Sequence, residues 1–298
     1  MKTWNLETLR ALDLKYAKEG LHMHQRPFRA AMEILGSTFS MGVGGNPEVQ
    51  KIMAAYEAMI PEVNSSWPGM GMGIGLAAVV DQVRKVTVPV VFGERALEPW
   101  SALGFSSKET WWLWCREDER LAAGTAFAFA DLLDLTYGLD DLKGGSCADL
   151  ELWKMATSNL ADAANNLPTT FSVDSVLQPI CLVAELAMKA ALVRNGADPK
   201  SFGQKGGEGH DLKKLSSRLA TEKPHRDDAH IADIVTRMPA YVGSRYKPAG
   251  LTRLDVVRLA LGVQFIAAST VRRYSDRDFA QPLEADDWPA PRPPLFDS

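Results

Sequence analysis

The stretch "QPICLVAELAMKAALVRNG" (residues 178–196) decides the fold, because its apolar residues nearly encircle a helix. A helix that is apolar on all sides is buried among neighbouring elements. Gly196 is expected to end it as a left-handed C-terminal cap. Glu185 and Lys189 stand four residues apart, in the order that stabilises a helix. The spacing fits an exposed ion pair, and the apolar setting also fits a partly buried pair anchored to another helix.

A second stretch, "GHDLKKLSSRL" (residues 209–219), restarts the chain as a helix after a glycine-rich connection. His210 or Asp211 can satisfy the free amides of the first turn, and an aspartate there adds favourable charge. Leucines at helical spacing then face the preceding helix: Leu212, Leu215 and Leu219. We predict that His210 is a helix-entry residue that forms a hydrogen bond across the connection. A solvent-facing functional role is the alternative.

Helical spacing extends over most of the chain. After a polar, glycine-bearing break at residues 137–147, it predicts helices over 148–165 and 252–274 and a shorter amphipathic piece at 228–246. Residues 109–137 read as one long helix, or as two joined near Gly124. The prediction is a mainly α protein with a boundary in the break. It has a helical N-terminal region of unknown function over 1–145 and a helical domain over 146–298, whose Pro-rich tail is irregular or held against a surface.

Strand signals are few. Two short stretches suggest a strand and a phosphate loop, but their sequences support neither fully. "KVTVPVVFG" (85–93) has β-branched residues, but Pro89 restricts it to an edge strand or linker. "WPGMGMGIG" (67–75) has the glycines of a phosphate loop without the required lysine or spacing. Tight packing of this glycine-rich segment against another backbone is the alternative.

Composition limits the class of protein. The chain has 298 residues, a net charge of −4 and 46% hydrophobic residues, which is typical of a globular protein without a general attraction to nucleic acid. Three cysteines without a CxxC fit a reducing compartment. The N-terminus lacks a secretory signal and no window reaches the length of uninterrupted apolar residues that a membrane span needs, so we predict a cytoplasmic protein.

The histidines do not form a metal-binding pattern. His22 and His24 are two residues apart, and His225 and His230 are five apart in an acidic connection. Helical metal sites use ligands three or four residues apart, so the prediction is no metal and no cofactor. A carboxylate–histidine site that includes Asp227 and Asp228 requires this segment to be a loop, and a solvated polar connection after Pro224 is the simpler account of the second pair.

The two opening stretches together resemble the HEPN domain of bacterial proteins, in which an apolar helix with E-L-x-x-K precedes a G-H-D-L helix start. Glu185, Lys189, His210 and Asp211 carry this structural motif. The later "YVGSRY" and the helix ending "RRY" are also similar to members of the group, so the resemblance covers about residues 148–275. It implies an up-and-down four-helix bundle, often a homodimer. The first half of the chain resembles no family.

The resemblance implies two kinds of function. Catalytic members are metal-independent ribonucleases that carry an arginine followed by a histidine, and Arg218 and His225 fit that pattern formally. A histidine can move the proton of a ribose hydroxyl and an arginine can stabilise phosphate charge. This pair comes earlier than the family pattern places it, with Pro224 between, and no histidine follows Arg237. The departure favours a non-catalytic member.

A positive surface offers another way to hold phosphate. It consists of Arg245, Lys247, Arg253, Arg258, Arg272 and Arg273, although a solvated helical face explains the same residues. The leading hypothesis is a non-catalytic binding or interaction module that forms a homodimer through the bundle and binds RNA, a nucleotide or a protein partner. The alternative is an endoribonuclease of the toxin or defence type. A third is a regulatory protein whose first 140 residues select the partner.

Overall fold

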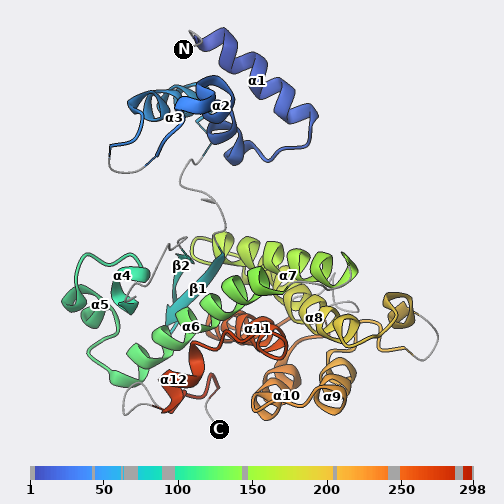
Figure 1. Ribbon diagram of the computed structural model, residues 1–298. Helices are drawn as coiled ribbons and strands as arrows, with labels where there is room; N and C mark the ends of the chain where they lie inside the picture. The colour runs from blue at the N-terminus through green and yellow to red at the C-terminus, as the bar shows by residue number, and fades with distance from the viewer. Residues whose placement is uncertain are drawn as a thin grey trace. The chain divides into compact units, whose positions relative to one another are not determined.

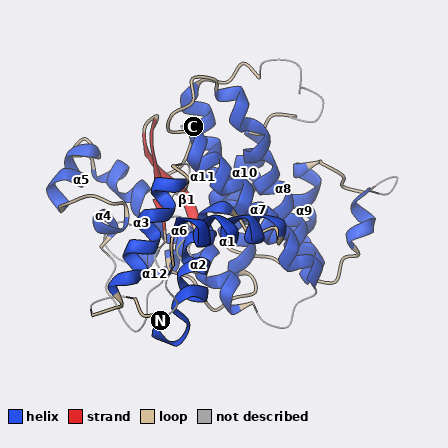
Figure 2. Ribbon diagram, turned by 90° about the horizontal axis from the view of Figure 1, so that it is seen from above, coloured by secondary structure: helices blue, strands red, loops and turns tan. Residues whose placement is uncertain are grey.

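The computed structural model describes residues 4–41, 44–61, 63, 73–88, 98–142, 147–203, 207–240, 249–285 and 291–296. The chain divides into two compact units, Met1–Met72 and Gly73–Ser298. Within the described ranges the secondary structure is almost entirely helical, with one two-stranded sheet (Figure 2). The predicted mainly α class is confirmed.

The first unit contains three α-helices and two short 3-10 helices: α1 (Leu6–Lys18), η1 (Met23–Gln25), α2 (Arg26–Leu35), η2 (Gly36–Thr38) and α3 (Pro47–Met59). Asn5 and Asn46 cap α1 and α3 with side-chain oxygens that accept backbone N–H bonds. The three α-helices share one apolar core, formed by Leu9, Tyr16, Ala30, Ala31, Ile34, Leu35, Val49, Ile52 and Tyr56. This core draws only on residues of the first unit.

The second unit contains the remaining elements, which are labelled in Figure 1. They are β1 (Ile74–Val79), β2 (Gln82–Thr87), α4 (Pro99–Ala102), α5 (Lys108–Trp114), α6 (Glu119–Asp141), α7 (Cys147–Asn166), η3 (Val173–Val176), α8 (Leu177–Arg194), η4 (Pro199–Gly203), α9 (Leu212–Glu222), α10 (Asp228–Arg237), α11 (Arg253–Arg272) and α12 (Ala280–Ala285).

Helix α8 lies at the centre of the bundle, against α7, α9 and α11 (Figure 1). Most of its side chains are buried, as the sequence of residues 178–196 predicts. Gly196 has φ 107°, which confirms the left-handed cap. Helices α8 and α11 are long and apolar enough to span a membrane by composition, but 78% of the apolar window of each is buried inside this structure. Burial of that extent is what a bundle core requires.

The β-hairpin packs against α6, α7 and α11, and glycine makes this possible. A β-carbon added at Gly75 would lie 2.3 Å from Oε1 of Gln264, a buried α11 residue. The Gln264 amide accepts a bond from the Leu76 N–H (2.9 Å) and donates to the carbonyls of Leu76 (3.1 Å) and Ala128 (2.8 Å). One side chain thus joins β1, α11 and α6. The tight packing expected for the glycine-rich segment is seen at its end, while residues 64–72 lie outside the described part.

Three details bear on the sequence-based expectations. The break in 109–137 lies at 115–118, between α5 and α6, and not at Gly124, because Arg116 and Glu117 adopt positive φ angles of 59° and 56°. Strand β2 ends at Thr87, before Pro89, and residues 89–97 lie outside the described part. The compact units meet at 72/73, whereas the predicted domain boundary is at 145/146: α6 packs on α11, so residues 73–142 share a body with the bundle.

Candidate functional site

The paired motif of α8 and α9 forms one polar cluster. Nδ1 of His210 lies 2.9 Å from Oε2 of Glu185, and Nζ of Lys189 donates to Oε1 of the same carboxylate at 2.7 Å. The Glu185 side chain is 4% exposed and that of His210 is 55% exposed. Asp211 caps α9, and its carboxylate accepts bonds from the amides of Lys213 and Lys214. The motif therefore ties the start of α9 to α8 across the connection.

Arg218, the predicted catalytic arginine, lies on α9 between two acids. Its Nε donates to Glu222 at 2.7 Å and its Nη1 donates to Glu208 at 3.1 Å. The bond to Glu222 is the main reason that the pKa of Arg218 is raised above its ordinary value. The guanidinium also lies over the ring of Phe202, 5.9 Å from the centroid. Arg218 thus takes part in the packing of α9 against η4.

His225, the predicted catalytic histidine, has a different set of partners. Its Nδ1 lies 3.2 Å from Oδ2 of Asp227, and its backbone N–H donates to Asp228 at 2.8 Å. The donor N–H lies three residues before Asp228, so these contacts shape the start of α10. The described contacts of His225 and Arg218 share no residue, so the two side chains are held by separate acidic groups.

The predicted phosphate-binding arginines Arg272 and Arg273 require a correction. The side chains of both are fully buried, at 0% exposure. Arg273 donates to Asp228 at 2.5 Å and to the carbonyl of Lys223. Buried guanidinium groups with protein acceptors hold the fold together and are not part of a positive surface. Arg245 and Lys247 lie outside the described residues.

Arg272 is the centre of a buried ion network. Its Nε donates to Asp134 at 2.7 Å, its Nη1 to Asp227 at 3.3 Å, and its Nη2 to Asp131. Burial raises the pKa of Asp134 to about 6 even beside this arginine. Burial would also raise the pKa of Asp227, but the bond to His225 and the charge of Arg272 hold that pKa well below its ordinary value. The network connects α6, α11 and the α9–α10 connection.

The C-terminal segment 291–296 enters the same network. Arg292 donates to both oxygens of Asp131, at 2.8 and 2.9 Å, and its guanidinium lies over the rings of Phe127 (4.5 Å) and Phe265 (4.7 Å). Its side chain is 16% exposed. A second carboxylate, Glu284 of α12, accepts from its Nε at 3.3 Å. The tail is thus held against the unit, as the sequence suggests.

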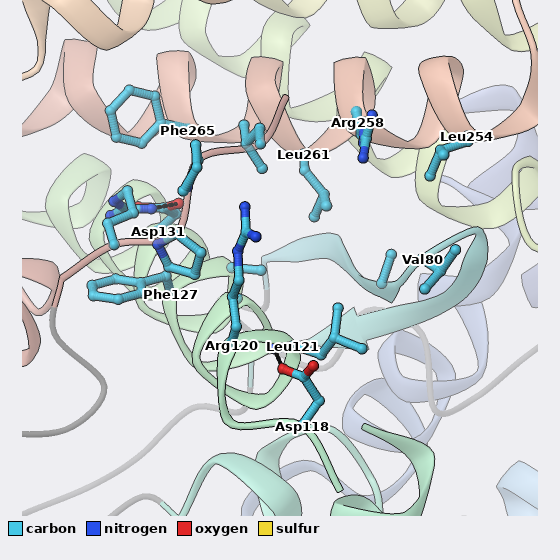
Figure 3. Close-up of a pocket in the computed structure, with 17 residues that line it drawn as sticks. Val80, Asp118, Arg120, Leu121, Phe127, Asp131, Leu254, Arg258, Leu261 and Phe265 are labelled. Carbon is cyan, nitrogen blue, oxygen red and sulfur yellow. Dashed lines mark hydrogen bonds and ion pairs between the residues drawn. The ribbon is translucent and has the colours of Figure 1, made fainter. Parts of the chain in front are cut away.

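A pocket of about 280 Å³ lies beside this tail, between α6, α11 and the turn of the hairpin. Figure 3 shows Arg120 of α6 and Arg258 of α11 extending into the same space from opposite sides. Arg292 contributes a third guanidinium. The other lining residues are apolar or acidic: Ala78, Val80, Asp118, Leu121, Gly124, Phe127, Ala128, Asp131, Leu254, Leu261, Phe265, Pro293, Pro294 and Leu295. Positive groups thus meet aromatic and aliphatic walls in one pocket that is partly open to solvent.

Sequence reasoning includes Arg258 in its positive surface but omits the other pocket residues. Arg120 and Phe127 lie in a stretch that the sequence marks only as helical, and Arg292 in one that it marks as irregular. For Arg292 the sequence offers one signal, the run "PRPP" (291–294), which fixes the arginine between prolines. Among the described residues, no group of three or more His, Cys, Asp or Glu side chains could hold a metal ion.

Comparison with known proteins identifies one domain. Residues 150–266 match the HEPN domain family, and this range covers α7 to α11 except the first residues of α7 and the last turns of α11. The chain therefore carries a HEPN domain, and the resemblance drawn from the α8 and α9 motifs is confirmed. Neither a curated protein nor a solved structure matches the chain significantly. Strands β1 and β2, α6 and the tail lie outside the match, so the pocket combines HEPN residues of α11 with elements added to the domain.

Proposed function

We propose that the HEPN domain of this chain is a non-catalytic binding module, and that its ligand is a nucleotide held in the pocket between α6, α11 and the tail. One observation carries this proposal: three arginines from three separate elements line one pocket whose other walls include Phe127 and Phe265. Arginine suits phosphate because its planar fork donates two parallel hydrogen bonds. The aromatic and leucine side chains offer apolar contact for a base or ribose.

Charge supports an anionic ligand. The lining contains three guanidinium groups and two carboxylates, in a protein whose net charge is −4. Asp118 accepts the Leu121 N–H as the cap of α6, and Asp131 is bound by Arg292. Both carboxylates therefore have positive or N–H partners on the protein. Three positive and two negative groups give the lining a net charge of +1, which raises the local concentration of phosphates.

The non-catalytic assignment is supported by the contacts of Arg218 and His225. A ribonuclease would need both side chains to reach one phosphodiester. In the described structure the Arg218 guanidinium bonds Glu208 and Glu222, and the His225 ring lies against Asp227. The test is RNA cleavage by the full chain and by His225→Ala. Cleavage by the parent chain that His225→Ala abolishes would replace the binding function with the endoribonuclease alternative.

The binding function is tested by thermal unfolding of the full chain with AMP, ADP, ATP, GTP and inorganic phosphate. A ligand at 100 times its Kd stabilises a protein by about 2.7 kcal/mol, which raises the Tm of a unit of this size by about 5–10 °C. Arg258→Gln should remove that rise. Arg277→Gln is the matched control, because Arg277 pairs with Asp141 at an exposed site that does not line the pocket. A nucleotide response that Arg258→Gln leaves unchanged would place the ligand elsewhere.

The assembly belongs to the same proposal. We infer a homodimer in the cytoplasm, with the first unit free to select a protein partner. The core of the first unit is formed by its own residues, as expected for a separately folded module, and this supports a role in selecting a partner. Light scattering after size exclusion measures the mass directly. A mass of one chain of 32.7 kDa at all concentrations would reject the dimer.

A further inference from the structure

Helices α4 and α5 build a second pocket, which the proposed function does not use. It has a volume of about 620 Å³, is open to solvent, and is lined by three tryptophans and three glutamates. The lining residues are Glu98, Pro99, Trp100, Lys108, Glu109, Trp111, Trp112 and Glu119. Figure 1 shows α4 and α5 standing beside the hairpin, away from α8 to α10.

The local sequence explains how this pocket forms. Ser107 caps α5 in a reciprocal box with Thr110, and Pro99 opens α4. Arg116 and Glu117 turn the chain with positive φ angles, so that Glu119 at the start of α6 comes next to α5. Trp111 is 3% exposed, and its indole N–H donates to Thr125 at 3.1 Å. Trp111 therefore forms a rigid part of the pocket wall.

The charge of the pocket is negative. Three carboxylates face one ammonium, that of Lys108. The described part of the chain contains no ion pair to Glu98 or Glu119, and both residues are exposed. Glu109 stays ionised, because its own backbone amide and the Ser107 hydroxyl lower its pKa. The pocket is thus complementary to a cation.

The rings favour an organic cation over a metal ion. The described glutamates are not grouped as metal ligands. Tryptophan faces attract cations through their quadrupole, and the attraction is largest for weakly hydrated, alkylated ammonium groups. The same segment already holds one cation this way: the Arg84 guanidinium lies 4.0 Å from the ring centroid of Phe105 and 5.9 Å from that of Trp114.

We propose that the pocket formed by Trp100, Trp111 and Trp112 with Glu98, Glu109 and Glu119 binds an alkylated ammonium group. The rings contact the alkyl substituents and the carboxylates balance the charge. Two sources supply this chemistry: a free quaternary amine, or a methylated lysine side chain on a protein. The site is separate from the arginine-lined pocket and takes a ligand of opposite charge. Its failure therefore leaves the nucleotide proposal unaffected.

The probes are choline, its neutral isostere 3,3-dimethylbutanol, and a short peptide with one trimethyllysine, each titrated into the full chain. Tryptophan fluorescence and ligand-observed NMR report binding. Choline or the peptide should bind at least about threefold more tightly than the neutral isostere, because a cation–π contact at a site open to solvent is worth about that factor. Preference for the peptide over choline would identify a protein ligand, and the reverse a small molecule. Equal binding of choline and the isostere, or no saturation by either cation, overturns the proposal.

Two variants assign the binding to this pocket. Glu119→Gln should weaken choline binding by about fivefold and leave the isostere unchanged, because it removes charge and keeps shape. Glu117→Gln is the matched control, since Glu117 lies in the same turn but does not line the pocket. Trp112→Leu should weaken binding by about tenfold. Circular dichroism checks its fold, and Glu119→Gln alone decides the question if Trp112→Leu unfolds. Unchanged choline affinity in Glu119→Gln places the cation elsewhere and rejects the site.

Discussion

Replacing Arg272 with methionine should destabilise the second unit severely. The substitution removes the guanidinium and keeps a long apolar side chain, so little volume is lost. Of the carboxylates that Arg272 binds, Asp131 retains two bonds to Arg292, and Asp227 retains its contact with His225. Asp134 keeps only N–H bonds from the backbone of Phe279 (2.6 Å) and Ala280 (3.4 Å). The variant therefore leaves one buried carboxylate without a counter-ion.

The expected loss in the free energy of unfolding follows from Asp134 alone. Removing one partner of a buried ion pair costs about 3–5 kcal/mol, a large part of the 5–15 kcal/mol that stabilises a typical protein. The loss also depends on pH. Burial already raises the pKa of Asp134 to about 6, and loss of Arg272 raises it further. A folded-state pKa above the unfolded one means that the folded variant binds a proton more readily. Its deficit relative to the parent chain should shrink by up to about 1.4 kcal/mol per pH unit as the pH falls to about 6, below which Asp134 is protonated in both folded proteins.

Urea unfolding followed by tryptophan fluorescence measures this loss at pH 8 and pH 5.5. Six of the eight tryptophans lie beyond residue 72, so the signal reports mainly the second unit. Arg277→Met is the matched control: Arg277 pairs with Asp141 at 2.5 Å, but its side chain is 49% exposed, and exposed pairs are worth about 0–1 kcal/mol. A loss below about 1 kcal/mol for Arg272→Met, or one that is the same at both pH values, would refute the structural role given to the network.

Three further predictions concern other parts of the second unit. Burial, followed by the charge of Arg292, lowers the pKa of His230 below 6.5. The unfolded chain therefore binds this proton more readily than the folded chain, and the stability should fall as the pH drops from 7 through 6.5. His230→Leu should reduce this loss in thermal scans at pH 7 and 5, and an unchanged slope would assign it to other groups. Gly75→Ala should cost at least about 1–3 kcal/mol through overpacking against Gln264, measured by urea unfolding; a neutral result would mean that the hairpin can shift. Burial raises the pKa of the Cys115 thiol to about 11 and of the Cys181 thiol to about 12, so in a Cys147→Ser background both should react with a thiol reagent only after urea is added. Rapid labelling of the native Cys147→Ser, Cys181→Ser double variant would show that Cys115 is accessible.

The sequence predicts the bundle well because its signals are local. The apolar circumference of α8, the cap at Gly196 and the Asp211 entry to α9 each depend on residues within a few turns. The break between α5 and α6 is missed for a physical reason. Arg116 and Glu117 adopt positive φ without being glycine, and no residue type announces such a turn.

The pocket is harder to predict, since its residues come together only in the folded unit. Arg292 and Asp131 are 161 positions apart, and nothing in either neighbourhood indicates the other. For Arg272 the sequence makes the opposite error, because it assigns a ligand-binding role to a residue that supports the core. Its position in a basic run suggests a surface role, but the acidic residues that neutralise it lie on α6 and before α10. Pairing of distant charges decides whether an arginine binds a ligand or supports the core.

The place of Arg292 in the chain has a consequence for synthesis on the ribosome. The first unit completes its core with residues up to Tyr56, so it can fold while the rest is still being translated. The second unit needs Arg292 to neutralise Asp131, and that residue emerges after nearly all of the others. At about 5–20 residues per second, translation of the 151 positions from the end of α6 at Asp141 to Arg292 takes roughly 8–30 s. During that interval α6 exposes an unbalanced acidic and aromatic face, which makes the nascent chain a natural client for chaperones.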